Sequence, residues 1–153
     1  MRQELGEGYR KVSKVVAVET NGYRQLVRAS PDYLGKDFVV EIYTTEVPKK
    51  LTDETLEDIF KYKELQARCY ALIFKVKYAY ILVIDTRTGS PFTKKIYMSR
   101  DLIKRTEEEL KQRTWEWIQG LAKKNPVSPW ECEKCIWRGG RCKNRGLDVW
   151  IRS

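Results

Sequence analysis

The sequence predicts an α/β (α+β) protein in which a mixed sheet of about five strands is flanked by helices. Three observations support this fold class: short runs of β-branched and aromatic residues, two longer segments of helical periodicity, and turn-forming residues between them. With 153 residues, of which 42% are hydrophobic, the chain has the length and composition of one packed domain.

The predicted elements follow one another in the order β-β-β-α-β-β-α. Turn formers at Asn21-Gly22 and at residues 31–35 separate the first three strands, which we expect to form a meander. Thr52 and Ser99 are the expected N-caps of the two helices. The strands are predicted at residues 14–20, 23–30, 37–45, 75–86 and 91–98, and the helices at residues 52–74 and 99–124.

The charge of the chain favours a polyanionic partner. There are 30 Lys and Arg residues against 21 Asp and Glu residues, and the resulting net charge of +9 favours nucleic acid. The chain contains no histidine, which excludes Ser-His and Cys-His nucleophile systems and every metal site that needs an imidazole. No apolar run is long enough for a membrane span and the N-terminus has no signal-peptide core, so we expect no membrane partner and a cytoplasmic location.

Periodicity divides the first helix into two faces. One face is predicted to be solvated and carries Glu57, Lys61, Glu64 and Arg68. The opposite stripe is predicted to be buried and carries Leu56, Ile59, Phe60, Ala67, Tyr70 and Phe74. Lys63 and Gln66 fall on the buried side, where polar groups need partners or a cleft. Either Lys63 reaches solvent at the edge of the core and Gln66 caps a backbone group, or both residues belong to a functional site.

Two acids lie near the third strand. Alternation places Glu41 on the same strand face as Val39 and Tyr43, where an isolated charge is costly, and Asp32 lies in the preceding loop. Carboxylates on neighbouring strands suit Mg²⁺ or Mn²⁺, because these ions take oxygen ligands and assist phosphodiester hydrolysis. The alternative is an exposed strand face on which Glu41 is an ordinary solvated acid.

Several short motifs occur in an order that resembles a known nuclease superfamily. Pro31-Asp32, then Glu41-Ile42-Tyr43, then a helix with Gln66-Ala67-Arg68-Cys69-Tyr70 resemble the PD-(D/E)xK nucleases. The Gln-x-x-x-Tyr element is similar to that of the RecB-like branch. The C-terminal C-x2-C-x6-C pattern resembles the cysteine cluster of the CRISPR-associated RecB-like exonucleases, and together the motifs cover roughly residues 25–142.

The resemblance implies a restriction-endonuclease-like core that hydrolyses DNA at single-stranded ends, with Mg²⁺ or Mn²⁺ as the cofactor. Asp32 and Glu41 would hold the divalent ion, the Ile42 carbonyl could add a ligand, and Gln66 and Tyr70 would line the DNA-facing side of the site. The family's usual N-terminal helix looks truncated or absent in this chain.

One residue departs from the family's pattern. The lysine that follows the glutamate by two residues is replaced by Tyr43, whose phenol carries no positive charge at neutral pH. Lys63 offers a substitute amine from the helix, which gives an enzyme with an atypical active site. The alternative is a degraded site in a catalytically silent DNA-binding or adaptor protein of a DNA-processing complex.

The C-terminal segment has the composition of a small metal knuckle. Residues 1–125 are predicted to form the nuclease-like domain, and residues 126–153 a cysteine-rich tail packed on it. Cys132, Cys135 and Cys142 lie beside basic residues that favour thiolates and that are expected to contact nucleic acid: Lys134, Arg138, Arg141, Lys143 and Arg145.

Two metal centres fit the cysteines. The resemblance implies a four-iron four-sulfur cluster, whereas thiolate ligation alone also permits zinc. Cys69 is either the fourth ligand or a small core residue, and a disulfide is a further alternative. A zinc-knuckle nucleic-acid-binding regulator without nuclease ancestry is therefore a third functional hypothesis.

The five tryptophans divide into two groups. Trp130, Trp137 and Trp150 either stack on unpaired bases or cover the metal centre. Trp117 is expected on the apolar side of the second helix, whereas Trp115 is expected to be partly exposed.

Overall fold

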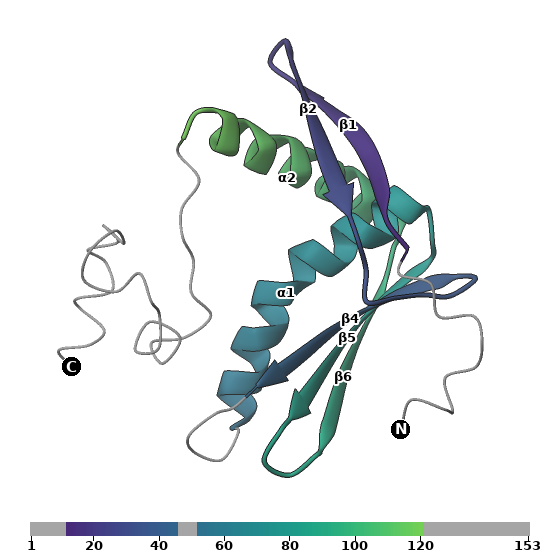
Figure 1. Cartoon of the computed structure of the whole chain (residues 1–153), viewed down its shortest axis with the longest axis vertical. Helices are drawn as coiled ribbons and strands as arrows, with labels where there is room; N and C mark the ends of the chain where they lie inside the picture. The colour runs from purple at the N-terminus through teal and green to yellow at the C-terminus, as the bar shows by residue number, and fades with distance from the viewer. Residues whose placement is uncertain (1–11, 46–51, 121–153) are drawn as a thin grey trace, which may run out of the picture.

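The computed structural model describes residues 12–45 and 52–120 and confirms an α/β arrangement. In these residues, two helices accompany a two-stranded sheet and a four-stranded mixed sheet (Figure 1). The five predicted strands are thus divided between two sheets, and a short additional strand joins the larger one. The predictions for the last residues of the second helix and for the cysteine-rich tail lie outside the described residues.

The first two strands form a hairpin that makes a sheet of its own. Strand β1 (Lys14–Thr20) pairs antiparallel with β2 (Tyr23–Ala29). Asn21 and Gly22 both have positive φ angles, 46° and 80°, as a tight two-residue hairpin turn requires. The predicted meander is wrong, because β2 does not pair with the strand that carries Glu41. That strand already has a neighbour on each of its edges.

The larger sheet has the strand order β3-β4-β5-β6. Its two central strands are parallel, with Phe38 opposite Tyr78, whereas both outer strands are antiparallel to their neighbours. Parallel neighbours need a crossover connection, which the first helix supplies. The strands are β3 (Tyr33–Leu34), β4 (Phe38–Thr45), β5 (Tyr78–Asp85) and β6 (Pro91–Tyr97).

Helix α1 (Asp53–Phe74) lies along one face of the larger sheet (Figure 1). Its first turn is capped by the predicted residue, because the side chain of Thr52 accepts a hydrogen bond from the amide of Thr55. The helix ends at Lys75, which adopts a left-handed conformation and whose amide bonds to the last turn. The apolar residues of α1 meet those of β4 and β5 in the core, which is centred on Val39, Ile59, Phe60, Ala67, Ala71, Ala79, Ile81 and Val83.

Helix α2 (Arg100–Ile118) begins after the predicted cap Ser99 and packs against α1 and β1. The residues that it buries are Thr106 and Thr114, whose hydroxyls donate hydrogen bonds to the carbonyls of Leu102 and Leu110. Because these hydroxyls are satisfied within the helix, polar positions can form the buried side.

The prediction for Trp117 is wrong, whereas Trp115 is partly exposed as expected. Trp117 is 71% exposed, whereas Trp115 is partly buried and its ring lies 5.6 Å from that of Tyr23 on β2. The hairpin sets the inward face of α2, and periodicity within the helix carries no information about the hairpin. Within the described ranges, neither helix is long and apolar enough to cross a membrane.

Candidate functional site

Glu41 lies on the buried face of β4. The predicted alternation is confirmed, because Val39 and Glu41 are buried whereas Ile42, which points to the other face of the strand, is exposed. Glu41 is only 6% exposed, so the alternative of an ordinary solvated acid is wrong. A carboxylate enclosed in this way needs cationic or hydrogen-bonding partners.

Asp32 lies beside Glu41 at the edge of the sheet. Tyr33 pairs with Val40, and continuing that antiparallel register places Asp32 next to Glu41. The Oδ2 atom of Asp32 accepts a hydrogen bond from the amide of Ile42 at 2.7 Å. The backbone of β4 therefore fixes the second acid next to the first.

The pKa of Glu41 is raised above its ordinary value. Burial is the main cause, the negative charge of Asp32 adds to it, and Lys63 acts in the opposite direction. The two acids therefore repel each other in a site with little water, which is the electrostatic condition that a bound cation relieves.

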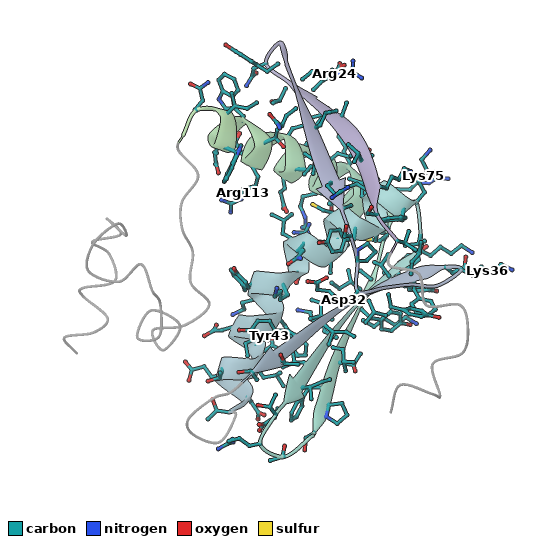
Figure 2. All side chains as sticks on the ribbon, in the orientation of Figure 1. Arg24, Asp32, Lys36, Tyr43, Lys75 and Arg113 are labelled. Atoms are coloured by element: carbon teal, nitrogen blue, oxygen red, sulfur yellow. The ribbon has the colours of Figure 1, made fainter. Side chains whose placement is uncertain are left out.

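Lys63 reaches the two acids from α1. Its Nζ lies 3.7 Å from Oε1 of Glu41 and donates a hydrogen bond to Oε1 of Gln66 at 3.3 Å. The ammonium also stands over the ring of Tyr43, 5.2 Å from its centroid. Figure 2 shows Tyr43 and Asp32 where α1 runs beside β4. The amine of Lys63 thus faces a polar cluster, and its membership of a functional site stays a prediction.

Gln66 and Tyr70 continue the same line of polar groups along α1. The Nε2 atom of Gln66 donates a hydrogen bond to the phenol oxygen of Tyr70 at 3.0 Å. The pKa of Tyr70 is raised, chiefly by burial, and the charges of Glu41 and Asp32 add to this effect. The phenol is therefore neutral at physiological pH and faces the acids. We call Asp32, Glu41, Lys63, Gln66 and Tyr70 the acidic cluster.

Tyr62 also belongs to this region, although no pattern in the sequence indicated it. Its exposed ring lies 5.6 Å from the ammonium of Lys63, so two tyrosines flank one amine. The only signal in the sequence is that an aromatic residue precedes Lys63, and adjacent helical positions are not normally neighbours on a face.

The prediction of a fully solvated helix face is wrong at Arg68. Its side chain is buried, and its guanidinium donates hydrogen bonds to Glu109 at 2.6 Å and to Thr106 at 3.2 Å. Its Nε lies 3.6 Å from Glu64. Helix α2 covers this part of α1, which the periodicity of α1 alone could not indicate. Arg68 therefore joins the two helices instead of facing water.

Cys69 is next to Arg68 on α1. Burial raises the pKa of its thiol to about 11, so the protonated form is favoured at neutral pH. Metal ligation needs the thiolate, and these surroundings favour the interpretation of Cys69 as a small core residue. Cys132, Cys135 and Cys142 lie outside the described residues, as do the neighbouring basic residues Lys134, Arg138, Arg141, Lys143 and Arg145.

The acidic cluster offers a divalent ion two carboxylates. Residues 12–45 and 52–120 contain no group of three or more Asp, Glu, Cys or His side chains that could hold a metal. Mg²⁺ is commonly held by one or two carboxylates while water and substrate oxygens fill the remaining positions. The donor set of Asp32 and Glu41 therefore fits Mg²⁺ or Mn²⁺.

Comparison with known proteins supports the fold. No family model matches the chain, and no curated protein matches it significantly. Among solved structures, the chain is similar to SSO0001, with a TM-score of 0.60 and 18% sequence identity. The match covers 84% of this chain but 57% of SSO0001, so the chain spans little more than half the length of that protein. At this identity the likeness concerns the arrangement of helices and strands alone.

Proposed function

We propose that this protein is a metal-dependent nuclease that hydrolyses phosphodiester bonds in DNA, with single-stranded DNA as its substrate. The observation that carries the proposal is the position of buried Glu41 between the carboxylate of Asp32 and the ammonium of Lys63. The likeness of the motifs to the CRISPR-associated RecB-like exonucleases supports the same activity.

Each carboxylate has a role in holding the divalent ion. Asp32 and Glu41 would hold Mg²⁺ or Mn²⁺ at the β3 edge of the sheet, where the amide of Ile42 fixes the orientation of Asp32. A divalent ion at this position would polarise the phosphodiester and lower the pKa of a water molecule. Because Glu41 is enclosed, the electrostatic interactions of its carboxylate are screened less than they are in water.

Lys63 supplies the positive charge that the strand lacks. Tyr43 occupies the strand position of the family's lysine, and the ammonium of Lys63 lies over the Tyr43 ring. From this place the amine can donate to a phosphate oxygen on which negative charge develops. The hydrogen bond to Gln66 orients the ammonium, and Tyr70 in turn accepts from Gln66. The helix thereby positions a row of donors beside the two acids.

The test is cleavage of end-labelled single-stranded DNA in the presence of Mn²⁺. We expect product from the wild-type protein, and none from Asp32→Asn or Glu41→Gln. Glu57→Gln is the matched control, because Glu57 is an exposed acid on α1. Cleavage that persists in both site variants would exclude the acidic cluster as the active site.

A second candidate is a catalytically silent DNA-binding or adaptor protein. The contact between Lys63 and Glu41 favours it, because an ammonium at 3.7 Å compensates the buried carboxylate without a divalent ion. This candidate predicts salt-sensitive binding of DNA with no Mn²⁺-dependent product from the wild-type protein.

The proposal includes a second cofactor and partner proteins. Cys132, Cys135 and Cys142 would hold a four-iron four-sulfur cluster, or zinc in the alternative case, at the C-terminal side of α2 in the chain. The basic residues among these cysteines would contact the DNA backbone. Other proteins of a DNA-processing complex are the proposed protein partners.

A further inference from the structure

The larger sheet has a second face that points away from α1. Side chains alternate along each strand. The side chain of Glu41 therefore faces the helix, whereas the side chains of Phe38 and Tyr80 face the opposite side. In the part of the chain that the structure describes, both helices lie on the α1 side of this sheet (Figure 1). Tyr33 and Tyr97 on the opposite face are 47% and 61% exposed.

Five aromatic rings cross this face from edge to edge. They are Tyr33 on β3, Phe38 on β4, Tyr78 and Tyr80 on β5, and Tyr97 on β6, and we call them the aromatic belt. Phe38 contacts Tyr33 and Tyr80 at centroid distances of 5.8 and 5.6 Å, and Tyr78 lies 5.6 Å from Tyr97. Each ring is thereby fixed by a neighbour on the next strand.

A lysine joins the two halves of the aromatic belt. The Nζ of Lys95 lies 4.2 Å from the ring centroid of Tyr78 and 5.7 Å from that of Tyr80. Lys36 lies at the tip of the turn between β3 and β4, pointing away from α1 (Figure 2). Among the residues of β3–β6 that share this face by alternation, none is Asp or Glu. The face therefore combines exposed rings with positive charge alone.

We propose that the aromatic belt binds single-stranded nucleic acid, with unpaired bases stacked on Tyr33 and Tyr97 and the phosphate backbone close to Lys95. Rings that are fixed on a sheet and interleaved with cations are suited to this ligand, since every base offers a flat face for stacking. The absence of Asp and Glu among the residues of β3–β6 on this face and the net charge of +9 complement a polyanion.

The proposed surface is separate from the acidic cluster and does not depend on hydrolysis. Glu41 and the aromatic belt project from opposite faces of the same sheet. A strand bound to the belt would leave the acidic cluster accessible to another part of the same strand. The belt thus goes beyond the proposed nuclease activity and would serve a silent binding protein equally well.

The experiment measures binding of a fluorescein-labelled oligodeoxyadenylate to the full chain, in buffer with EDTA so that no cleavage occurs. We expect Tyr97→Ala and Tyr33→Ala each to weaken binding by roughly 5- to 100-fold, the range for losing one stacked base. Tyr97→Phe keeps a ring and should bind within about twofold of the wild type. Duplex DNA of the same length, whose bases are already stacked, should bind all these variants equally.

Tyr23→Ala is the matched control, because Tyr23 is 54% exposed but lies on β2, outside the belt. A second measurement locates the contact directly: photo-crosslinking of a bromodeoxyuridine-substituted strand, which should label Tyr97 or Tyr33. Equal affinities for the wild type and both alanine variants, or crosslinks confined to other residues, would overturn the proposal. So would a wild-type dimer that Tyr97→Ala converts to a monomer without any change in binding of the oligonucleotide.

The result is distinguishable from a failure of the proposed nuclease. Glu41→Gln should retain the binding that depends on the aromatic belt whether or not the wild-type protein cleaves DNA. Loss of binding in the belt variants with no cleavage by the wild type would support the belt and reject the nuclease.

Discussion

The ammonium of Lys63 lies 3.7 Å from a carboxylate oxygen of Glu41, which joins the centre of α1 to the buried face of β4. This distance is longer than that of a strong charged hydrogen bond. The ammonium is shared among Glu41, the carbonyl oxygen of Gln66 at 3.3 Å and the ring of Tyr43 at 5.2 Å. The ring of Tyr62 at 5.6 Å is a further weak partner, and a lysine held in this way remains able to donate to a phosphate.

Lys63→Met should reduce Mn²⁺-dependent cleavage of single-stranded DNA by roughly 10²- to 10³-fold, the usual cost of removing one donor to a developing anion. The methionine retains the apolar stem and removes the amine. Lys61→Met is the control, because Lys61 is exposed on the same helix. The measurement is the single-turnover rate at saturating protein.

A double variant sharpens this prediction. Tyr43→Lys places an amine at the strand position that lysine occupies in the PD-(D/E)xK motif, so adding it to Lys63→Met should restore at least part of the lost rate. A wild-type rate in Lys63→Met alone would show that the amine takes no part in cleavage.

Glu41→Gln should increase the free energy of unfolding at neutral pH. Burial and Asp32 raise the pKa of Glu41 above its ordinary value of 4.5, so the folded protein binds this proton more tightly than the unfolded chain does. The stability that protonated Glu41 contributes is present below pH 4.5 and is lost as the pH rises through the raised pKa. Glutamine resembles the protonated acid, and its advantage should therefore grow with pH.

Urea denaturation of both proteins at several pH values measures this difference. Glu57→Gln changes an exposed acid on α1 and should show little dependence on pH relative to the wild type. A constant difference between Glu41→Gln and the wild type across the acidic and neutral range would contradict the raised pKa.

Mn²⁺ should raise the melting temperature of the wild-type protein, because an ion that binds only the folded state stabilises it by mass action. At 100 times the dissociation constant, the gain is about 2.7 kcal/mol. Asp32→Asn and Glu41→Gln should lose most of this shift. An equal shift in both variants would place the bound ion elsewhere, and the cysteine variants described below would then be compared in the same assay.

Glu109→Ala should destabilise the protein by about 1–3 kcal/mol, because the buried guanidinium of Arg68 loses its shortest hydrogen bond. Glu108→Ala provides the control, since Glu108 is exposed one residue earlier and should cost less than about 0.5 kcal/mol. Thermal or urea unfolding measures both effects. Equal stability of the two variants would mean that Arg68 gains nothing from Glu109.

The freshly purified protein should be brown with broad visible absorption if the C-terminal cysteines hold an iron-sulfur cluster, and colourless with bound zinc in the alternative case. Cys135→Ala should remove the metal in either case. Cys69→Ala should retain it, because the raised pKa of Cys69 favours a core thiol. Metal analysis of the three proteins distinguishes these outcomes, and loss of metal in Cys69→Ala would identify Cys69 as the fourth ligand.

Local patterns in the sequence predicted most of the secondary structure. The caps Thr52 and Ser99, the Asn21-Gly22 turn and the inward position of Glu41 each depend on neighbouring residues in the chain, and all are confirmed. The failures concern contacts between distant elements. Nothing within the first helix indicates that α2 covers Arg68. Likewise, nothing within the first strands indicates that β3 pairs with the edge of β4, where a meander would have β2.

The acidic cluster could be predicted in part for the same reason. Strand alternation and helix periodicity placed Glu41, Lys63 and Gln66 on inward faces, and the structure has Lys63 in contact with both of the others. The ring of Tyr62 beside the ammonium depends on side-chain direction, which spacing along a helix does not determine. Whether the cluster cleaves DNA remains a prediction that the cleavage assay tests.

The parallel pairing of β4 with β5 has a consequence for how the molecule folds. Every residue of β4 pairs with a partner 40 positions later in the chain, so the sheet forms only after a long loop has closed. The same closure presses α1 onto β4 and carries Lys63 to Glu41. The acidic cluster should therefore form late in folding, and any fluctuation that lifts α1 from the sheet should separate its acids from its amine.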